Sequence, residues 1–467
     1  MFDADRLAEA VDGYWWLGRK YDGEALPVTD SRGDLHGKIF FALRGERFDG
    51  HDFMIEAGRR GAAAVVADAL ETRRCAEAHA AGIPVLLVSD TLRAYQLVGK
   101  AWREKFPGIT AAAVTGSVGK TAVKEMLRAI FAAASSPEAV LATVGNTNNQ
   151  IGVPRNLLEI NPRHRFAVIE MGTNHHGEIA ALAPLAGASV SVITAIAACH
   201  LEHLGNLEGV AFEKGHIFSG SPEASAAVIP AGAPGEAVLR RAAGSRRVLT
   251  FGKAGSGADM ELLAAEATFL TPGRVIMKSR DGVRIEFEWR LPGEYLALDA
   301  CAAGLAALAL GIPGETVAAG LAGTVLPGMR ARVINRGSCV WVLDAYNANP
   351  ASMEALIVNM AGSDLRGRRL IMVLGDMLEL GSGSRDAHRQ MLRLVRERLP
   401  ECELLLVGGE FAAAQAAERD PAAECFAEAA ELKSRLEKAE GAVIALKASH
   451  SIGLEKALPA DLTDALK

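Results

Sequence analysis

The sequence predicts an α/β protein of three domains, and three observations lead to that prediction. The chain has 467 residues, which at roughly 150 residues per domain suggests three units. Short β-branched apolar runs alternate with Ala-rich runs of helical spacing along most of the chain. Two Pro-Gly pairs, at 107–108 and 327–328, interrupt this alternation. The predicted domains are therefore 1–108, 109–327 and 328–467.

Composition and charge exclude several classes of protein. Half of the residues are hydrophobic and 23% are charged, which is typical of a soluble globular chain. The formal net charge is -6 and no dense Lys/Arg block occurs, which argues against a protein that binds nucleic acid. The six cysteines are scattered without a C-x-x-C pair, so neither a zinc site nor a disulfide framework is indicated. Free thiols and the lack of a signal-peptide pattern favour a cytoplasmic location.

One uncharged stretch, residues 179–201, is long enough to span a membrane. It is diluted by Ala, Gly and Ser and interrupted by Pro184 and Gly187. We therefore predict no membrane span here, but a short helix followed by a buried strand at 189–196.

In the first domain, strands are predicted at 37–43, 62–67 and 84–88, with an Ala-rich helix between the last two. Residues 91–106 have helical spacing and stop before Pro107. The second domain opens with a strand at 109–115, a glycine turn and a helix at 120–134. Further strands are predicted at 165–172 and 189–196, then hairpin-like alternation at 267–293 and a helix near 297–310.

The third domain repeats the alternation, with strands at 339–346, 368–377, 402–409 and 441–449 and helical runs between them. This order predicts a parallel sheet covered by helices. In such open sheets, ligands bind at the carboxyl ends of the strands. The turns that follow the predicted strands are therefore the places to look for chemistry.

The strongest motif is VTGSVGKTAVKEML at 114–127. A strand leads into a glycine turn, and Lys-Thr then opens a helix, so the turn amides and the helix N-terminus form a site for phosphate oxygens. Lys120 would reach the β- and γ-phosphates of ATP, and the Thr121 hydroxyl would bind Mg²⁺. The strict P-loop pattern requires glycine where Val114 stands, so the motif is a shorter form. Its predicted ATP-binding residues are Thr115, Gly116, Ser117, Val118, Gly119, Lys120 and Thr121.

With this motif the chain resembles the Mur ligases, which use ATP to join amino acids or peptides to UDP-N-acetylmuramoyl precursors of peptidoglycan. The resemblance runs from about residue 29 to residue 455. Within the family it is closest to the member that adds D-alanyl-D-alanine to the UDP-muramoyl-tripeptide. The resemblance implies a small N-terminal α/β domain for the uridine nucleotide, a central P-loop ATPase domain with a parallel sheet, and a C-terminal Rossmann-like α/β ligase domain.

Residues 29–53 are similar to the family's segment for the uridine nucleotide, which implies that Ser31 and Arg32 contact the UDP part of the substrate. An arginine offers a planar charged fork for diphosphate or uracil oxygens. By itself, Asp30-Ser31-Arg32 is only a polar turn. GNTNNQIGVP at 145–154 resembles the loop near the γ-phosphate and the substrate carboxylate. That match assigns substrate contacts to Asn148 and Asn149.

Two further segments carry the implied metal site. EMGTNHHGEI at 170–179 places Glu170 at a strand end as a magnesium ligand and His175 among the substrate-binding residues. CHLEHLGNLEGVAFEKGHIF at 199–218 places His200 and Lys214 beside a second Mg²⁺, with the lysine carbamylated by CO₂. A carbamate presents the oxygen atoms that Mg²⁺ prefers. Lys120, His200 and Lys214 are the implied catalytic residues. Without the resemblance, the histidine and Lys214 would be packing or surface residues.

YNANP at 346–350 is the segment most specific to the D-alanyl-D-alanine-adding type, and MVLGDMLELG at 372–381 points the same way. The resemblance implies that Asn347 binds ATP. It implies that Arg330, Asp344, Tyr346 and Asn349 bind substrate. The bare sequence Asn-Ala-Asn-Pro also predicts a turn that caps the following helix.

The chain departs from the family pattern at a segment that lines the adenine in other members. Tyr295, Leu296 and Asp299 stand where His, Asn and Asn are usual, so adenine binding is expected to be altered. Near the C-terminus Lys-Gly-Ser-Arg is replaced by Lys447-Ala448-Ser449-His450, and His216 stands where an acidic residue is common.

The sequence therefore predicts an ATP-dependent amide ligase that adds D-alanyl-D-alanine to UDP-N-acetylmuramoyl-tripeptide through an acyl phosphate. Its expected cofactors are ATP and two Mg²⁺ ions, and we expect a monomer. One alternative is another Mur-type or folylpolyglutamate-like ligase; another is a non-catalytic nucleotide-binding protein on this scaffold. The third residue of the tripeptide does not follow from the sequence.

Overall fold

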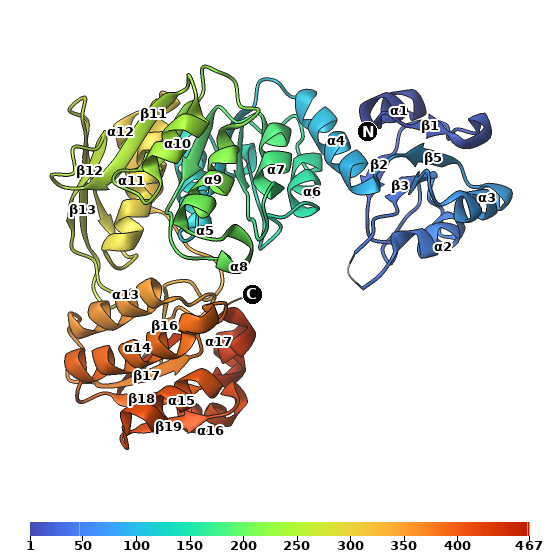
Figure 1. Ribbon diagram of the computed structural model, residues 1–467. Coiled ribbons are helices and arrows are strands. Elements are labelled where there is room, and N and C mark those ends of the chain that lie inside the picture. The colour runs from blue at the N-terminus through green and yellow to red at the C-terminus, as the bar shows by residue number, and fades with distance from the viewer. Residues whose placement is uncertain (46, 465, 467) are drawn as a thin grey trace.

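The protein contains three β-sheets. The structure is a computed structural model that describes residues 1–45, 47–464 and 466. Figure 1 shows an N-terminal domain at one side, a central domain beside it and a C-terminal domain beneath the central one. The sheets have five, nine and six strands among the described residues. The three-domain α/β architecture predicted from the sequence is confirmed.

The N-terminal sheet has the order β1-β5-β4-β3-β2. Strands β2 to β5 pair in parallel, and β1 pairs antiparallel with β5. The strands are β1 (Tyr14–Trp15), β2 (Leu26–Val28), β3 (Lys38–Phe41), β4 (Ala64–Asp68) and β5 (Val85–Val88), and the helices are α1 (Ala4–Val11), α2 (Met54–Arg59) and α3 (Thr72–Ala80).

The central sheet is mostly parallel, and the hairpin predicted at 267–293 adds antiparallel strands at one edge. It has the order β14-β13-β12-β11-β10-β9-β6-β8-β7, and β12, β13 and β14 pair antiparallel. The run at 267–293 folds back as a hairpin and extends the parallel sheet at its edge. The parallel strands are β6 (Thr110–Thr115), β7 (Val140–Ala142), β8 (Phe166–Glu170), β9 (Val190–Ile193), β10 (Ala226–Pro230), β11 (Arg247–Lys253) and β12 (Met260–Ala265), followed by β13 (Gly273–Ser279) and β14 (Arg284–Trp289).

Helices cover both faces of the central sheet, which explains why its strands read as continuous apolar runs. In β6, Ala112 and Val114 pack on one face while Ala111 and Ala113 pack on the other. One layer contains α5 (Lys120–Ala134), α11 (Glu294–Ala309) and α12 (Gly314–Ala322). The other contains α6 (Gly152–Leu158), α7 (Glu178–Ala186), α9 (Leu207–Gly215) and α10 (Glu236–Ala243), and the short α8 (Leu201–Leu204) precedes α9.

The uncharged stretch at 179–201 contains most of α7, the buried strand β9 and the loop after it. The expected short helix and strand are therefore confirmed. Over the described parts of the chain, no helix combines the length and the apolar character needed to cross a membrane.

The helix α4 (Thr91–Glu104) joins the N-terminal and central domains, as Figure 1 shows. It packs on α1 and also on α6 and α7. Gly99 allows this close approach, because a Cβ atom there would lie 2.8 Å from the Cβ of Pro154. Trp102 Nε1 donates to the carbonyl oxygen of Ile160 at 2.9 Å. The last predicted helix of the first domain thus rests on the second.

The C-terminal sheet has the order β15-β16-β20-β17-β18-β19. It is parallel except for the edge strand β15, which pairs antiparallel with β16 and was not predicted. The strands are β15 (Arg332–Arg336), β16 (Cys339–Leu343), β17 (Arg369–Gly375), β18 (Glu403–Val407), β19 (Ala423–Phe426) and β20 (Ala442–Lys447), with helices α13 (Pro350–Ala361), α14 (Ser384–Arg398), α15 (Gly409–Glu418), α16 (Lys433–Glu437) and α17 (Ala460–Asp464).

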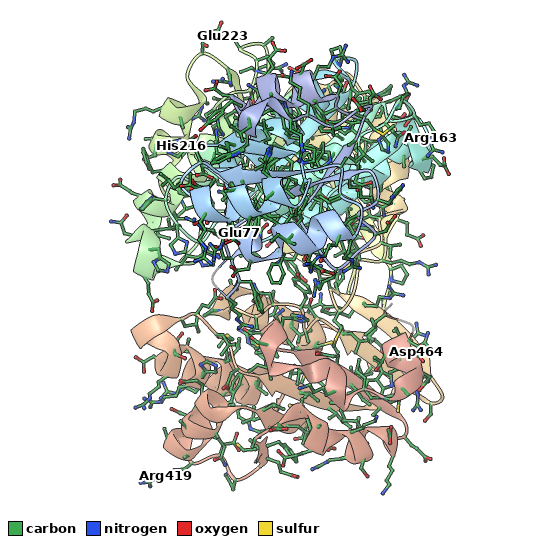
Figure 2. The ribbon with its side chains drawn as sticks, turned by 90° about the vertical axis from the view of Figure 1, so that its right-hand side faces the viewer. Glu77, Arg163, His216, Glu223, Arg419 and Asp464 are labelled. Carbon is green, nitrogen blue, oxygen red and sulfur yellow. The ribbon has the colours of Figure 1, made fainter. Side chains whose placement is uncertain are left out.

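Figure 2, turned from the first view, shows the C-terminal domain as a separate body below the other two. Arg419 marks its end farthest from the central domain, whereas Glu77 of the N-terminal domain lies in front of the central domain in this view. The loops that follow β6, β8 and β16 meet at the junction of the central and C-terminal domains. The carboxyl ends of strands from two different sheets therefore face one site.

Candidate active site

A cavity of about 530 Å³ lies between the central and C-terminal domains. From the central domain come the turn after β6, the loops after β7, β8 and β9, and the start of α11. From the C-terminal domain come the loops after β16, β17 and β20. Most of the predicted site residues line it: Ser117, Val118, Gly119, Lys120, Thr121, Asn148, Asn149, Glu170, His200, Arg330, Asp344, Tyr346, Asn347 and Asn349.

The turn after β6 is held in shape by the segment that follows β9. Ser117 N donates to the Ala195 carbonyl oxygen at 2.9 Å, and Ser117 Oγ bonds with Ala197 at 3.0 Å. Gly116 is required here, because a Cβ atom would lie 1.9 Å from Thr194 Oγ1. Gly119 has φ 85° and caps α5 without a side-chain hydrogen bond. The first amides of α5 therefore stay available for an anion, as the motif predicted.

Lys120 folds back over this turn, and its Nζ donates to the Gly116 carbonyl oxygen at 2.8 Å. Its charge therefore lies over the turn that would hold the phosphates. Thr115, the remaining predicted ATP-binding residue, is fully buried, and its Oγ1 donates to the Met171 carbonyl oxygen at 2.7 Å. Thr115 supports the turn from beneath and does not line the cavity.

Thr121, Glu170 and Asn148 form one hydrogen-bonded group. Thr121 Oγ1 donates to Glu170 Oε2 at 3.0 Å, and Asn148 Nδ2 donates to Glu170 Oε1 at 2.8 Å. The backbone amide of Glu170 donates to Thr143 Oγ1 at 3.0 Å. These contacts hold a buried carboxylate at the end of β8, directly beside the first turn of α5. The side chain of the neighbouring Asn149 instead holds the turn before α6, since its Oδ1 accepts from Ile151 N and Gly152 N.

Lys214 lies in α9 and is 2% exposed. Burial, with a smaller contribution from the charge of Lys120, lowers the pKa of Lys214 to about 8. A neutral amine is what reaction with CO₂ requires, so this environment fits the carbamate that the resemblance implies. The preceding residue, Glu213, is fully buried and accepts from Gly177 N at 2.7 Å and from Ile179 N at 2.9 Å. It anchors α9, a role that the sequence reasoning missed.

His200 has an unusual backbone conformation, with φ 49°, just before α8. Its Nδ1 atom lies 3.7 Å from Glu379 Oε2 on the C-terminal domain. Burial lowers the pKa of His200, and the Glu379 carboxylate acts in the opposite direction. The histidine therefore faces the cleft and contacts the other domain.

On the C-terminal side, Lys447 ties two predicted residues together. Its Nζ donates to Asp344 Oδ2 at 2.8 Å and to the Asn347 carbonyl oxygen at 3.0 Å. Asp344 Oδ1 also accepts from Ala331 N at 3.1 Å. Asn349 caps α13 through a reciprocal pair of hydrogen bonds with Ser352, as the sequence predicted.

Tyr346 lies between two other side chains of the cavity wall. The Arg330 guanidinium is 3.3 Å from the centre of the Tyr346 ring, and the His450 ring stacks on it at 5.3 Å. The histidine stands where the family usually has arginine. The contact gives this wall an aromatic surface with a positive charge on one side.

Three predicted substrate residues lie outside the cavity. Arg32 is exposed and pairs with Asp30 at 2.9 Å, and this partner holds the pKa of Asp30 at about 2. Arg60 fixes the same turn by donating to the carbonyl oxygens of Ser31 and Arg32. The exposed His175 side chain packs against His203, with the two ring centres 4.1 Å apart and the rings tilted.

The departures from the family pattern gather at the start of α11. Tyr295, Leu296 and Asp299 all line the cavity. The Asp299 carboxylate lies so close to the glycine turn that a Cβ atom on Gly119 would be 2.5 Å from Oδ1. Burial raises the pKa of Asp299 well above its usual range. Its carboxyl group is therefore neutral at pH values where an ordinary aspartate is charged.

The donor atoms in the cavity fit a hard cation better than a soft one. Thr121, Glu170 and Asn148 bring hydroxyl, carboxylate and amide oxygens to one place, and oxygen is the ligand that Mg²⁺ prefers. Within the residues that the structure describes, no group of three or more His, Cys, Asp or Glu side chains could hold a metal ion. The oxygen donors of Thr121, Glu170 and Asn148 fit Mg²⁺.

Comparisons with known proteins agree with this geometry. Three family models match the chain: the Mur ligase family catalytic domain at residues 28–101, the Mur ligase middle domain at 114–307, and the Mur ligase glutamate ligase domain at 329–450. The UDP-N-acetylmuramoyl-tripeptide--D-alanyl-D-alanine ligase of Escherichia coli (strain K12) is 35% identical over 78% of this chain and 77% of its own. The chain belongs to the Mur ligase family.

Two further relatives extend the Mur ligase match over nearly the whole chain. The ligase of the same name from Treponema pallidum is 32% identical and covers 94% of both chains. A crystal structure of MurF from Acinetobacter baumannii is 30% identical, covers 99% of both chains and superposes with a TM-score of 0.86. The family resemblance inferred from the motifs is confirmed.

Proposed function

We propose that this Mur ligase adds D-alanyl-D-alanine to UDP-N-acetylmuramoyl-tripeptide, using ATP, in the synthesis of peptidoglycan precursors. The observation that carries the proposal is the single cavity in which the glycine turn and Lys120 face the YNANP loop of the C-terminal domain. That loop is the segment most typical of D-alanyl-D-alanine-adding enzymes. It also argues against the alternatives of another Mur-type or a folylpolyglutamate-like ligase.

In this reaction, ATP phosphorylates the terminal carboxylate of the tripeptide, and the amine of the dipeptide then attacks the acyl phosphate. Such phosphoryl transfer needs positioning and charge neutralisation more than covalent help from the protein. The α5 amides and Lys120 bind the phosphates, and the loop containing Asn148 and Asn149 contacts the substrate carboxylate. No Ser/His/Asp nucleophile is required.

The same proposal includes two Mg²⁺ ions. Thr121 and Glu170 would hold a magnesium ion, and Glu170, His200 and a carbamate on Lys214 would hold the second. When bound, the metal neutralises negative charge between the γ-phosphate and the attacked carboxylate. The burial of Lys214 supports its carbamylation, because the amine loses its proton more readily than an exposed lysine.

The remaining roles concern the two substrates. Arg330, Asp344, Tyr346 and Asn349 are proposed to bind substrate in the cavity, and Asn347 the nucleotide. Ser31, Arg32 and His175 lie outside the cavity, so their proposed contacts are with distant parts of the long UDP substrate. The scattered free cysteines support a cytoplasmic location, and we propose a monomer.

The decisive experiment measures ADP release with UDP-N-acetylmuramoyl-tripeptides, each with and without D-alanyl-D-alanine. We expect release that depends on both substrates, and a product whose mass equals the sum of the two less one water. Varying the third residue of the tripeptide identifies its preferred form. ATP binding without any turnover in the presence of both substrates would instead support the non-catalytic alternative.

A further inference from the structure

The loop between β17 and α14 projects one carboxylate into the cleft. Glu379 has φ 63°, a left-handed backbone conformation that is unusual for a residue other than glycine. Its side chain is 76% exposed, lines the cavity and reaches across to His200 on the central domain. A strained backbone conformation thus occurs at a residue that faces the other domain. Strained residues of this kind cluster at functional sites.

Buried polar groups fix this loop in place. His388 in α14 is fully buried; its Nδ1 donates to the Ser384 carbonyl oxygen at 2.7 Å, so its Nε2 accepts from Met377 N at 2.9 Å. Leu378 N donates to Ser449 Oγ at 2.9 Å. The residues on the N-terminal side of Glu379 are thus anchored from two directions. The glutamate is presented by a rigid support and not by a loose surface loop.

Charge distribution singles out Glu379 on this side of the cleft. Among the described residues of the C-terminal domain, two carboxylates line the cavity, Asp344 and Glu379. Asp344 is already satisfied by Lys447 and by the Ala331 amide. Within the described part of the C-terminal domain, Glu379 has no hydrogen-bond or ion-pair partner, and its contact with His200 across the cleft is long, at 3.7 Å. It is the carboxylate that remains available to a cationic ligand.

We propose that Glu379 binds the α-ammonium group of the incoming dipeptide and so places its nitrogen opposite the phosphate-binding turn. This inference rests on the proposed function, because that function brings a cationic acceptor into the cavity. An ammonium group donates three hydrogen bonds and needs an anionic partner when water is excluded. In the structure this carboxylate faces the His200 imidazole at 3.7 Å. His388 is the positioning residue that holds the loop.

The primary test is the variant Glu379→Gln, which keeps the shape of the side chain and removes its charge. We expect the KM for D-alanyl-D-alanine to rise by at least about tenfold, since a charged hydrogen bond is lost. The KM values for ATP and for the UDP-tripeptide should stay within about twofold of wild type. Glu437→Gln, an exposed glutamate of the same domain in α16, is the matched control and should behave as wild type.

Two probes separate ammonium binding from a general structural role. D-lactyl-D-alanine carries a hydroxyl in place of the ammonium group; wild type should bind it much more weakly than the dipeptide, whereas Glu379→Gln should discriminate little. Hydroxylamine, a small neutral nucleophile, traps the acyl phosphate as a hydroxamate, and wild type and variant should form it at similar rates.

The outcomes distinguish this inference from the proposed function. If wild type releases no ADP with the tripeptide and dipeptide, the proposed function itself is wrong. If wild type is active but Glu379→Gln keeps its KM for the dipeptide and its preference over D-lactyl-D-alanine, ammonium binding by Glu379 is refuted. A variant that also loses hydroxamate formation would equally refute it, because the defect would then precede the acceptor.

Discussion

Thr121 at the start of α5 and Glu170 at the end of β8 are joined by a 3.0 Å hydrogen bond from hydroxyl to carboxylate. Asn148 donates to the other oxygen of the same carboxylate at 2.8 Å. The glycine turn, the loop after β7 and the strand end are thereby linked in one rigid group. This group fixes where phosphates and a cation would bind, and the predictions below depend on it.

Lys120→Ala should abolish most turnover. The charge over the glycine turn would be lost, which we expect to lower kcat by at least two orders of magnitude, about 3 kcal/mol, as for one well-placed charged group. The melting temperature should change little, since the turn is still held by Ser117 and Thr194. Steady-state kinetics and thermal unfolding test this. Lys100→Ala on α4 is the control, and near-normal ligation by Lys120→Ala would refute the P-loop assignment.

Lys214→Ala should lose activity by about 100-fold if a carbamate at this position holds a metal. Added acetate or formate should restore part of the loss, because each supplies a carboxylate to the vacated space. Lys214→Arg should be as inactive as the Ala variant, since arginine keeps the positive charge but forms no carbamate. Activity assays with and without the added anions measure this. Lys278→Ala, an exposed lysine on β13, is the control, and an active Lys214→Arg would exclude a required carbamate.

Asp299→Asn should change how ATP binding depends on pH. Burial raises the pKa of Asp299, so the wild-type carboxyl group keeps its proton to a higher pH than an ordinary aspartate and becomes an anion beside Gly119 only above that range. The KM for ATP should therefore rise with pH in wild type and stay flatter in the variant. The folded state also binds more protons than the unfolded state above the ordinary carboxyl range, so wild-type stability falls as the pH rises. The Asn side chain does not ionise, so the stability of Asp299→Asn should not show this fall with pH.

The matched control for this experiment is Asp281→Asn, which changes an exposed aspartate between β13 and β14. It should retain the pH profile of wild type for both ATP binding and unfolding. The prediction fails if Asp299→Asn and wild type show the same pH dependence.

Ligand binding should close the cleft between the central and C-terminal domains. Groups from the C-terminal domain, such as Asp344 and Tyr346, must meet a nucleotide that the central domain binds. Small-angle scattering with an ATP analogue and the UDP-tripeptide should show a smaller radius of gyration than the free protein. The hinge is expected near residues 327–328. An unchanged profile on addition of both ligands would argue against this movement.

The sequence determined the class of fold and the order of its elements. The helix predicted at 120–134 coincides with α5, because the glycine turn and the helical spacing of apolar residues are local signals. The strands of the parallel cores were visible as apolar runs because both faces of each sheet are covered. The hairpin β13–β14 follows the alternation predicted at 267–293. The edge strand β15 was not predicted, since an edge strand pairs with only one neighbour and its direction is set by the chain's return path.

The motifs likewise pointed to the glycine turn, and most of the site residues that they predicted line the cavity. Only the tertiary structure decided which of them meet. It placed Glu379 beside His200, although 179 positions separate them (379 minus 200), because the contact forms between two domains. It buried Lys214 and Asp299, and burial rather than residue type shifts their pKa values. It also left Ser31 and Arg32 outside the cavity, since the position of one domain on another depends on packing surfaces that local sequence patterns do not encode.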